Sequence, residues 1–444
     1  MQCFKYCGII VLLCTVISAR TAGMSAAQEL SDLSSNPSRT LRVDYIFSGT
    51  DRSQDISLDE MSCFDGWAGR TVNMDMVPVR GNGQISMTDA AGGQVLYRQS
   101  FSTLFQEWQT TEEATRLRKS FENVFLLPMP SSRAVVKVEL YDFRGGVSAS
   151  LSHVVDPADV LIRKQVPCNV PNEYILESGD PKECIDVAIV AEGYTSDEME
   201  TFYEDARKAV DAILSHRPFG EYRDRFNFVA VALTSNESGV SVPGEGDWKD
   251  TALKSHFNTF YMDRYLTTLR LKNLHDRLTG IPYEHIIILA NTDTYGGGGI
   301  FNSYTLTTAH HKSFEPVVVH EFGHSFAGLA DEYYYDDQFV EYYYPDCEPW
   351  EQNITTLYDF ASKWEDMLPR TVSLPSPTPE IPIWDETGNG MNSLIGVYEG
   401  AGYQSKGVYR PYPDCRMKTN SPKAFCPVCQ RAIARIIDFH TIGE

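Results

Sequence analysis

The sequence predicts an α+β protein with two domains, in which a β-sandwich precedes a mixed sheet packed on helices. Its 444 residues exceed what one ordinary hydrophobic core accommodates. Short alternating segments follow one another to about residue 155, whereas strands and helices alternate after a proline-rich stretch. One largely apolar helix also carries two histidines four residues apart. These features predict domains at residues 28–160 and 161–444, after a leader at residues 1–27.

The composition is that of a globular protein with a strongly acidic surface. Apolar residues make up 42% of the chain and charged residues 22%, and the formal net charge is -22. Such a surface repels nucleic acid and anionic membranes. We therefore expect no nucleic-acid partner, and the acidic balance suits a protein that works outside the cytoplasm.

Residues 1–27 have the features of a secretory signal. Lys5 supplies the positive charge, and residues 8–19 form an apolar run too short to span a bilayer. Ala19 and Ala27 are suitable cleavage positions. A lipoprotein anchored at Cys14 ranks second, because the preceding residue is not small. No other stretch predicts a transmembrane anchor, so we expect an exported protein that is secreted, periplasmic or at the cell surface.

The first domain reads as a series of short strands. In residues 41–47 apolar side chains alternate with charged ones, as in a half-buried strand. Further candidate strands are residues 70–79, 84–87, 94–98 and 134–141. The glycine-containing turn at residues 89–93 predicts a hairpin, and residues 111–121 have a local helical pattern. Trp67 and Trp108 are either core residues, which we favour, or a binding surface.

A proline-rich linker at residues 156–172 leads to the second domain. Its predicted strands are residues 185–191, 226–233, 285–290 and 301–308, and its predicted helices are residues 197–216, 259–278, 313–327 and 426–439. Four glycines at residues 296–299 read as a flexible loop near a substrate cleft. They lack the lysine and the spacing of a phosphate-binding loop.

The strongest chemical signal is His320-Glu321-Phe322-Gly323-His324, an H-E-x-x-H pattern. Residues four apart share one face of a helix, so both imidazoles can point at one ion. The carboxylate of Glu321 then lies beside the first histidine, within reach of a water that zinc activates. The alternative is a helix with two structural histidines and an ion-paired glutamate. The apolar run before the pattern and the carboxylates after it favour the metal site.

Two histidines hold zinc weakly, so a third ligand is expected. Gly328 allows the chain to turn after the helix, and Asp331 and Glu332 are the next residues with donor atoms. Adjacent side chains of an extended segment point in opposite directions, so only one of the two should bind the ion. His310 and His311 precede the helix and are alternatives, of which at most one can share the site.

Three of the ten cysteines lie within the leader, so the chain without its leader keeps an odd number of cysteines. At least one thiol is therefore free or bridges outward. Cys168 and Cys184 flank a proline-rich loop and are a reasonable disulfide pair. Cys426-Pro-Val-Cys429 suggests a second zinc site as an alternative, but the sequence shows no clear second ligand pair beside it.

Acidic residues and tyrosines fill residues 331–346. A solvated rim is the interpretation we favour. A Ca²⁺ site built from these carboxylates is the alternative.

The extended motif around the histidines resembles the M64 metallopeptidases, a family that includes an IgA peptidase. The matching residues are His320-Glu-x-x-His324-x-x-x-Gly328-Leu-x-Asp331-Glu-Tyr333, then Tyr409-Arg-Pro411, Cys415-x-Met417 and Phe425-Cys-Pro-Val-Cys429. The resemblance covers essentially the mature chain. It implies a zincin fold, one catalytic zinc ion and endopeptidase activity.

The resemblance also implies roles for residues beyond the histidines. Asp331 becomes the third ligand, because it lies near the third ligand position of metzincins, displaced by one residue and with aspartate in place of histidine. Glu332 would orient a histidine or the loop. Met417 resembles the methionine beneath the metal in metzincins, and Tyr409 is a candidate for substrate or structural support.

We therefore expect an exported zinc endopeptidase in which Glu321 activates water. Its substrate would be an extracellular protein, either immunoglobulin A or a mucin-like glycoprotein. The alternative is an exported glycan- or protein-binding adhesin whose zincin domain is vestigial, and a metal-dependent amidase is a minor option. The intact H-E-x-x-H pattern favours the enzyme. The sequence predicts no oligomeric state.

Overall fold

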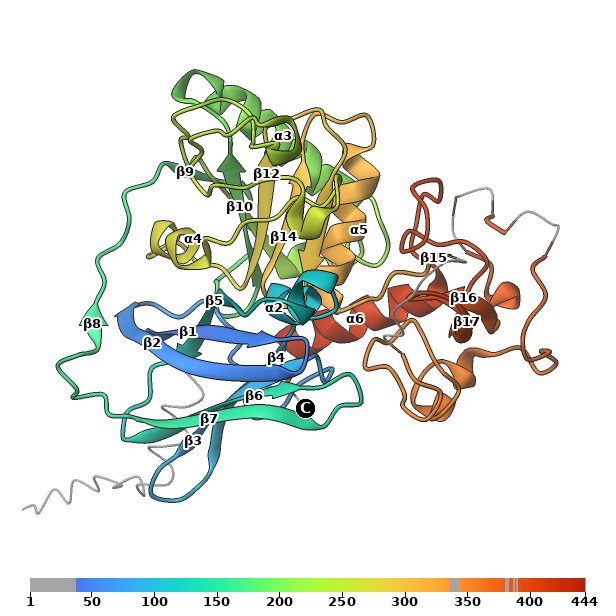
Figure 1. The fold of residues 1–444 in the computed structure, drawn as a ribbon, viewed down its shortest axis with the longest axis horizontal. Coiled ribbons are helices and arrows are strands. Elements are labelled where there is room, and N and C mark those ends of the chain that lie inside the picture. Colours follow the sequence, from blue (N-terminus) through green and yellow to red (C-terminus); the bar gives the residue numbers. More distant parts are fainter. Residues whose placement is uncertain (1–36, 336–342, 380–382, 386–387, 389, 444) are drawn as a thin grey trace, which may run out of the picture.

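The computed structural model describes residues 37–335, 343–379, 383–385, 388 and 390–443 (Figure 1). The expected leader and residues 336–342 of the acidic tyrosine-rich segment lie outside these ranges. Within them, no helix combines the length and the apolar content needed to cross a bilayer. The chain forms a mixed α/β structure with more sheet than helix.

Two four-stranded sheets form the N-terminal region and share one core. Their strand orders are β5-β1-β2-β8 and β4-β3-β6-β7. The strands are β1 (Arg39–Thr50), β2 (Ser53–Asp65), β3 (Gly83–Asp89), β4 (Val95–Phe101), β5 (Lys119–Pro128), β6 (Ala134–Tyr141), β7 (Val147–Val155) and β8 (Arg163–Lys164). Phe101 of the second sheet packs on Phe47 and Phe125 of the first, with ring centroids 6.2 and 4.6 Å away. The predicted hairpin at β3 and β4 is present.

Both candidate surface tryptophans belong to this core. Trp108 is fully buried and its ring stacks on Phe105. It lies at the end of α2 (Leu104–Trp108), a helix that precedes β5. Trp67 is also buried, and its indole N–H donates to the carbonyl of Arg70. Neither side chain therefore offers a binding surface.

A six-stranded sheet, ordered β13-β14-β12-β10-β11-β9, carries the second part of the chain. Its strands are β9 (Asn172–Leu176), β10 (Ile185–Glu192), β11 (Phe226–Val231), β12 (His285–Ala290), β13 (Gly297–Ile300) and β14 (Tyr304–Thr308). The four inner strands are parallel, and the two edge strands are antiparallel to their neighbours. This is the mixed sheet that the alternating pattern predicts.

Successive residues of the central strand β10 point to opposite faces of this sheet. Val187 and Ile189 pack in a core with α3 (Met199–Leu214), α5 (Phe314–Ala327) and α6 (Pro427–Thr441). Ala188 and Val190 join the core that continues into the N-terminal sheets and includes α4 (Leu271–Arg277). The strand is therefore apolar throughout because both faces are covered. A separate three-stranded sheet has the order β15-β17-β16, with β15 (Tyr334–Tyr335), β16 (Tyr398–Ala401) and β17 (Tyr403–Arg410) (Figure 1).

Four predicted elements are wrong. The helical pattern at residues 111–121 gives only a 3-10 turn at Glu112–Thr115, and β5 already begins at Lys119. Residues 296–299 form most of an edge strand, not a loop, because a Cβ at Gly299 would lie 2.2 Å from the carbonyl oxygen of Glu321 and only glycine permits that approach. The helix expected at residues 259–278 shrinks to α4, because Asn258, Phe260 and Tyr261 have positive φ. Residues 70–79 are irregular, since the carbonyls of Asn73 and Met76 turn inward to accept hydrogen bonds from Arg70.

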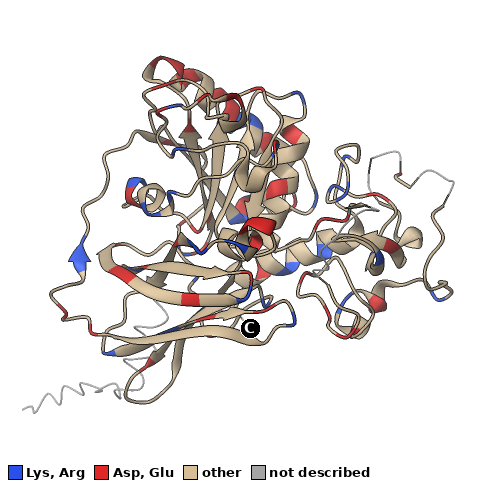
Figure 2. Ribbon diagram, in the orientation of Figure 1, with Lys and Arg blue, Asp and Glu red and all other residues tan. Residues whose placement is uncertain are grey.

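Acidic residues are spread over the whole ribbon (Figure 2). They occur on α2, α3 and the N-terminal sheets, whereas β8 is basic. Arg163 and Lys164 of β8 pair with Glu60 and Asp65. No single acidic face stands out in this view.

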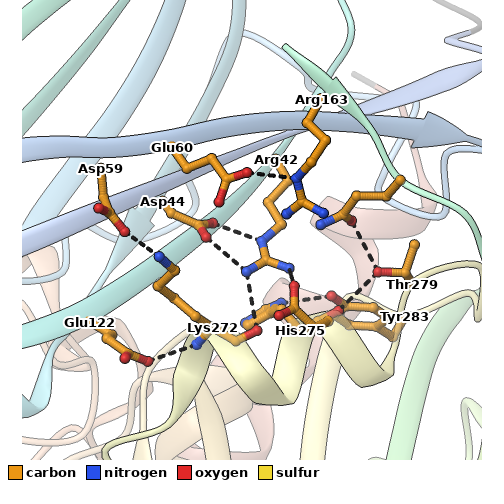
Figure 3. Close-up of polar contacts among 12 residues, drawn as sticks. Arg42, Asp44, Asp59, Glu60, Glu122, Arg163, Lys272, His275, Thr279 and Tyr283 are labelled. Carbon is orange, nitrogen blue, oxygen red and sulfur yellow. Dashed lines mark hydrogen bonds and ion pairs between the residues drawn. The ribbon is translucent and has the colours of Figure 1, made fainter. Parts of the chain in front are cut away.

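A buried ion-pair network joins the N-terminal sheets to α4 (Figure 3). Arg42 of β1 is 2% exposed, and its guanidinium binds both oxygens of Asp44 at 2.7 and 2.8 Å. The same group also reaches Asp276 at 2.6 Å and the carbonyl of Lys272 at 3.1 Å. The side of β1 predicted to face water is therefore covered by α4, and Arg42 fixes the N-terminal sheets against the second part of the chain.

We expect Arg42→Met to lower the free energy of unfolding by about 3–5 kcal/mol, because it leaves Asp44 buried without its cation. Arg163→Met is the matched control. Its pair with Glu60 is 56% and 37% exposed, so its loss should change stability by less than about 1 kcal/mol. Urea unfolding of both variants measures the difference, and equal losses would contradict this role of Arg42.

Candidate functional site

A cleft of about 710 Å³ runs between the N-terminal region and the edge of the six-stranded sheet. It is lined by α2, β13, α5 and the loops that follow α5. His320, Glu321, His324 and Asp331 all contribute to its walls. Clefts between substructures are frequent sites of ligand binding.

Helix α5 places both histidines in this cleft. Val318 and Val319 are buried in the core that α5 shares with α3 and α6, whereas Val317 lines the cleft together with the histidines. Ser313 occupies the N-cap position, although its side chain makes no capping hydrogen bond. Gly328 ends the helix with φ of 60°, and its N–H donates to the carbonyl of His324 at 2.9 Å. The left-handed turn sends the chain back toward the helix.

Three donor atoms converge at the end of this turn. Nε2 of His320 lies 3.0 Å from Nε2 of His324 and 3.0 Å from Oδ1 of Asp331. Nε2 of His324 lies 3.2 Å from the same carboxylate oxygen. The side chains are only 13%, 14% and 6% exposed. Bonds of about 2.0 Å to a tetrahedral zinc ion would put such atoms about 3.3 Å apart, so the cluster has the size that one ion requires.

The outer nitrogens of both rings are held by backbone carbonyls. Nδ1 of His320 contacts the carbonyl of Arg416 at 2.8 Å, and Nδ1 of His324 contacts that of Leu329 at 2.5 Å. Because each Nδ1 must carry a hydrogen to make these bonds, each Nε2 presents a lone pair to the centre of the cluster. Two lone pairs and a carboxylate oxygen then face one another. This donor set fits a shared cation.

The electrostatics of the cluster agree with that fit. Burial opposes ionisation of Asp331, but attraction to His324 and the close approach of both imidazoles lower the pKa of its carboxyl well below the usual range. Burial likewise opposes a charge on His324, yet Asp331 raises the pKa of its imidazole to about 9. The Asp331 carboxylate therefore favours a positive charge among these atoms.

Glu321, the second residue of the H-E-x-x-H segment, lines the same cleft. Strand β13 passes close to it, since a Cβ at Gly297 would lie 3.3 Å from Oε1 of Glu321. Burial raises the pKa of the Glu321 carboxyl, although His320 and His324 oppose the shift. The glycines of β13 thus allow a strand, a carboxylate and the two histidines to share one narrow space.

Asp331 and Glu332 point in opposite directions, as expected for neighbours in an extended segment. Asp331 turns to the histidines, and its second oxygen accepts a short hydrogen bond from the hydroxyl of Tyr403 in β17. Glu332 turns away into a fully buried pocket beside Cys429 and Asn353. Glu332 therefore does not join the histidine cluster.

Met417 and Tyr409 differ in their relation to the cluster. Met417 is fully buried under α5, where a Cβ at Gly323 would lie 2.9 Å from its sulfur. Its carbonyl accepts a hydrogen bond from the N–H of Glu332 at 2.8 Å. Tyr409 pairs through its backbone with Thr355 and is not part of the cleft wall.

The structure does not bring the alternative histidines to the site. Nε2 of His310 contacts Asp205 of α3 at 2.7 Å, and the ring of His311 packs on Tyr295. In the acidic tyrosine-rich segment, exposed Asp346 pairs with Arg144 as a rim residue would. Among the described residues, this segment contributes to no cluster of three or more metal-binding side chains apart from the two that contain Asp331 and Glu332.

Three residues of the cleft, Tyr403, Glu107 and Tyr265, carry no local signal in the sequence. Tyr403 fixes Asp331, and Glu107 of α2 meets the hydroxyl of Tyr265 in a short hydrogen bond. Burial raises the pKa of Glu107 to about 7, against the effect of that hydrogen bond. No local pattern could reveal these residues, because each reaches the cleft from a distant part of the chain.

The α/β fold and the cluster of two imidazoles and a carboxylate beside a glutamate are typical of metal-dependent hydrolases. Within this class, the chain matches models of one peptidase family. Residues 174–389 and 384–437 match the family described as IgA Peptidase M64, and residues 34–152 match the Peptidase M64 N-terminus. The chain therefore belongs to the M64 peptidase family and consists of its N-terminal domain followed by the peptidase domain. A search of the curated proteins found no significant match.

We expect Tyr403→Phe to weaken metal binding at the histidine cluster by about 10- to 100-fold, because Asp331 loses the hydroxyl that orients it. Tyr398→Phe is the matched control, since its hydroxyl donates to the backbone carbonyl of Leu394 away from the cleft. Competition with a chromogenic chelator measures both affinities. An unchanged affinity in Tyr403→Phe would show that this hydrogen bond does not position the carboxylate.

Proposed function

We propose that this chain is a zinc-dependent endopeptidase with a zincin-type active site. His320, His324 and Asp331 are the metal ligands in this proposal, and Glu321 is the general base. The observation that carries it is the convergence of two imidazole nitrogens and one carboxylate oxygen within 3.2 Å. All three face a cleft that also contains Glu321.

The donor set fits zinc better than a hard cation. Two neutral imidazoles and one carboxylate are common protein ligands of catalytic zinc, whereas Ca²⁺ takes six or more oxygen ligands. When bound, zinc supplies Lewis-acid polarisation of a carbonyl and makes water a stronger nucleophile at neutral pH. The carbonyls of Arg416 and Leu329 keep both imidazoles in the tautomer that such binding needs.

Glu321 would move the proton in the reaction. Its carboxylate takes a proton from the attacking water and returns it to the nitrogen of the leaving amine. The approach of β13 keeps the carboxylate within this cleft. Tyr403 holds Asp331 while this occurs, and therefore acts as a positioning residue.

The edge strand β13 offers a place for an extended substrate. Its only neighbour in the sheet is β14, so its other edge has no strand partner among the described residues. A polypeptide can add to such an edge through main-chain hydrogen bonds. Bound there, its backbone would pass Glu321 and the histidines, which suits cleavage within a chain.

We further propose that the enzyme is exported and acts on extracellular proteins. The signal-like residues 1–27 and the acidic net charge of -22 support export. The description of the matching family contains IgA, so immunoglobulin A and mucin-like glycoproteins are the substrates to test first. In this proposal residues 28–160 form the accessory domain and residues 161–444 the catalytic domain.

An adhesin with a vestigial active site receives less support. Trp67 and Trp108, which motivated it, lie in the core. The N-terminal domain instead contributes Glu107 and Arg80 to the cleft wall. An intact set of histidines and base beside that wall favours catalysis.

We expect Glu321→Gln to reduce kcat by roughly 100- to 10,000-fold while the metal content and fold stay unchanged, because only proton transfer is lost. Mass spectrometry of a peptide library and of purified immunoglobulin A would detect cleavage by the parent protein. Glu315→Gln, an exposed change in the first turn of α5, is the matched control. Cleavage by Glu321→Gln at the parental rate would refute the assigned base.

We expect Asp331→Asn to lose its metal from the histidine cluster under mild chelation, because the amide provides no anionic ligand. His311→Ala should retain it, since this ring lies outside the cluster. Metal analysis after dialysis against a chelator distinguishes the two variants. Equal retention would remove Asp331 from the ligand set.

A further inference from the structure

A second group of metal-binding side chains lies behind the proposed active site. Cys415, Cys426, Cys429 and Glu332 place one donor atom each within 4.8 Å of one another. All four residues are fully buried, and all three thiols are free. The sulfur atoms of Cys415 and Cys429 are 3.8 Å apart, and that of Cys429 lies 3.1 Å from Oε1 of Glu332.

These distances suit a tetrahedral ion. Zinc–sulfur bonds of about 2.3 Å give a tetrahedral edge of about 3.8 Å, which is the separation of the two sulfur atoms. A disulfide would require the sulfurs at about 2.0 Å. Three sulfurs and one oxygen complete a four-ligand set of the closed type that structural zinc sites use.

The carboxyl group of Glu332 has one buried oxygen without a hydrogen-bond partner. Oε2 of Glu332 is buried and makes no hydrogen bond, although its companion Oε1 accepts one from Asn353 at 3.0 Å. A buried carboxylate oxygen without a partner is costly and rare in native proteins. A cation among the three sulfurs would satisfy this carboxylate.

A backbone N–H group and the N-terminus of a helix face the thiol cluster. Cys426 is the N-cap of α6, and its N–H donates to the sulfur of Cys415 at 3.2 Å. Pro427 begins the helix, whose N-terminal end favours negative charge on Cys426 and Cys429. Arg410 and Arg416, both 4% exposed, lie near enough to interact with Glu332 and Cys415 respectively. Two buried guanidinium groups beside three thiols and a carboxyl balance an anionic metal complex.

We propose that Cys415, Cys426, Cys429 and Glu332 bind a structural Zn²⁺ ion, separate from the histidine cluster. On binding, the three thiols release their protons to solvent and no electron is transferred. This site does not depend on the proposed peptidase activity. It explains why a C-x-x-C pair occurs without a second pair: the remaining ligands are one cysteine from the loop before α6 and one glutamate from the loop after α5.

The second ion would fix the two loops that complete the histidine cluster. Glu332 follows Asp331 directly, and its N–H donates to the carbonyl of Met417. Cys415 precedes Arg416, whose carbonyl holds Nδ1 of His320 at 2.8 Å. One ion that joins Glu332 to Cys415 therefore fixes the position of Asp331 and the orientation of the His320 ring. Cys415 and Glu332 are positioning residues for the active site.

Metal analysis and cobalt substitution of the full-length protein test this proposal. We expect two zinc ions per chain in the parent protein, and one in His324→Ala and in Cys415→Ser. Cobalt-loaded parent protein and His324→Ala should show sulfur-to-cobalt charge-transfer absorption, because only the second cluster contains thiolates. Cys415→Ser should lose this absorption, because it no longer binds the second ion, and its melting temperature should be several degrees lower. Cys168→Ser, which removes a thiol outside the cluster, is the matched control and should keep both ions.

If Cys415→Ser does not fold, the proposal can be tested on proteins in which all four proposed ligands are intact. A mercurial reagent that blocks thiols should release one zinc ion per chain, detected with a colorimetric chelator, from His324→Ala as from the parent. Zinc content of one ion per chain in the parent, with no charge-transfer band after cobalt loading, would overturn the proposal. So would an unreduced mass that reveals a disulfide among Cys415, Cys426 and Cys429.

Discussion

The site depends on one constraint: three lone-pair donors are held within 3.2 Å of one another by a helix and the turn that ends it. Helical spacing brings His320 and His324 together, and the left-handed turn at Gly328 returns Asp331 to them. Such a group of acceptors is unfavourable unless a cation shares it. The carbonyls of Arg416 and Leu329 hold both imidazole rings, so neither ring can rotate its Nε2 lone pair away from the cluster.

The rest of the fold supplies the surroundings that this cluster needs. Val318 and Val319 of α5 are buried in the core, and β13, an edge strand of the central sheet, approaches Glu321 and His324 of α5 through glycines. The N-terminal domain closes the cleft with α2, and Arg42 anchors that domain to α4 (Figure 3). The cysteine cluster lies where the loops carrying Glu332 and Cys415 meet. Two metal sites on adjoining loops would make the geometry of one depend on the other.

Local patterns predicted those features that depend on neighbours in sequence. Strands such as β6 and β12, the helix α5 and the opposite directions of the Asp331 and Glu332 side chains followed from periodicity and turn chemistry, whereas the choice of Asp331 as the ligand came from the family resemblance. The glycine-rich edge strand was not predicted, because its glycines are required by the close approach of the α5 backbone and not by a turn. Tyr403, Glu107 and the two side chains that join the Cys426–Cys429 pair, Cys415 and Glu332, also escaped prediction, since their partners are distant in sequence. Cys168 and Cys184, expected as a pair, carry free thiols in this structure.

Anomalous diffraction at the zinc absorption edge, from crystals of the zinc-loaded protein, would locate the ion. We expect a peak in the cleft bonded at about 2.0–2.2 Å to Nε2 of His320, Nε2 of His324 and a carboxylate oxygen of Asp331. Absence of a peak between these three side chains, or a peak there whose ligands exclude Asp331, would contradict this ligand assignment.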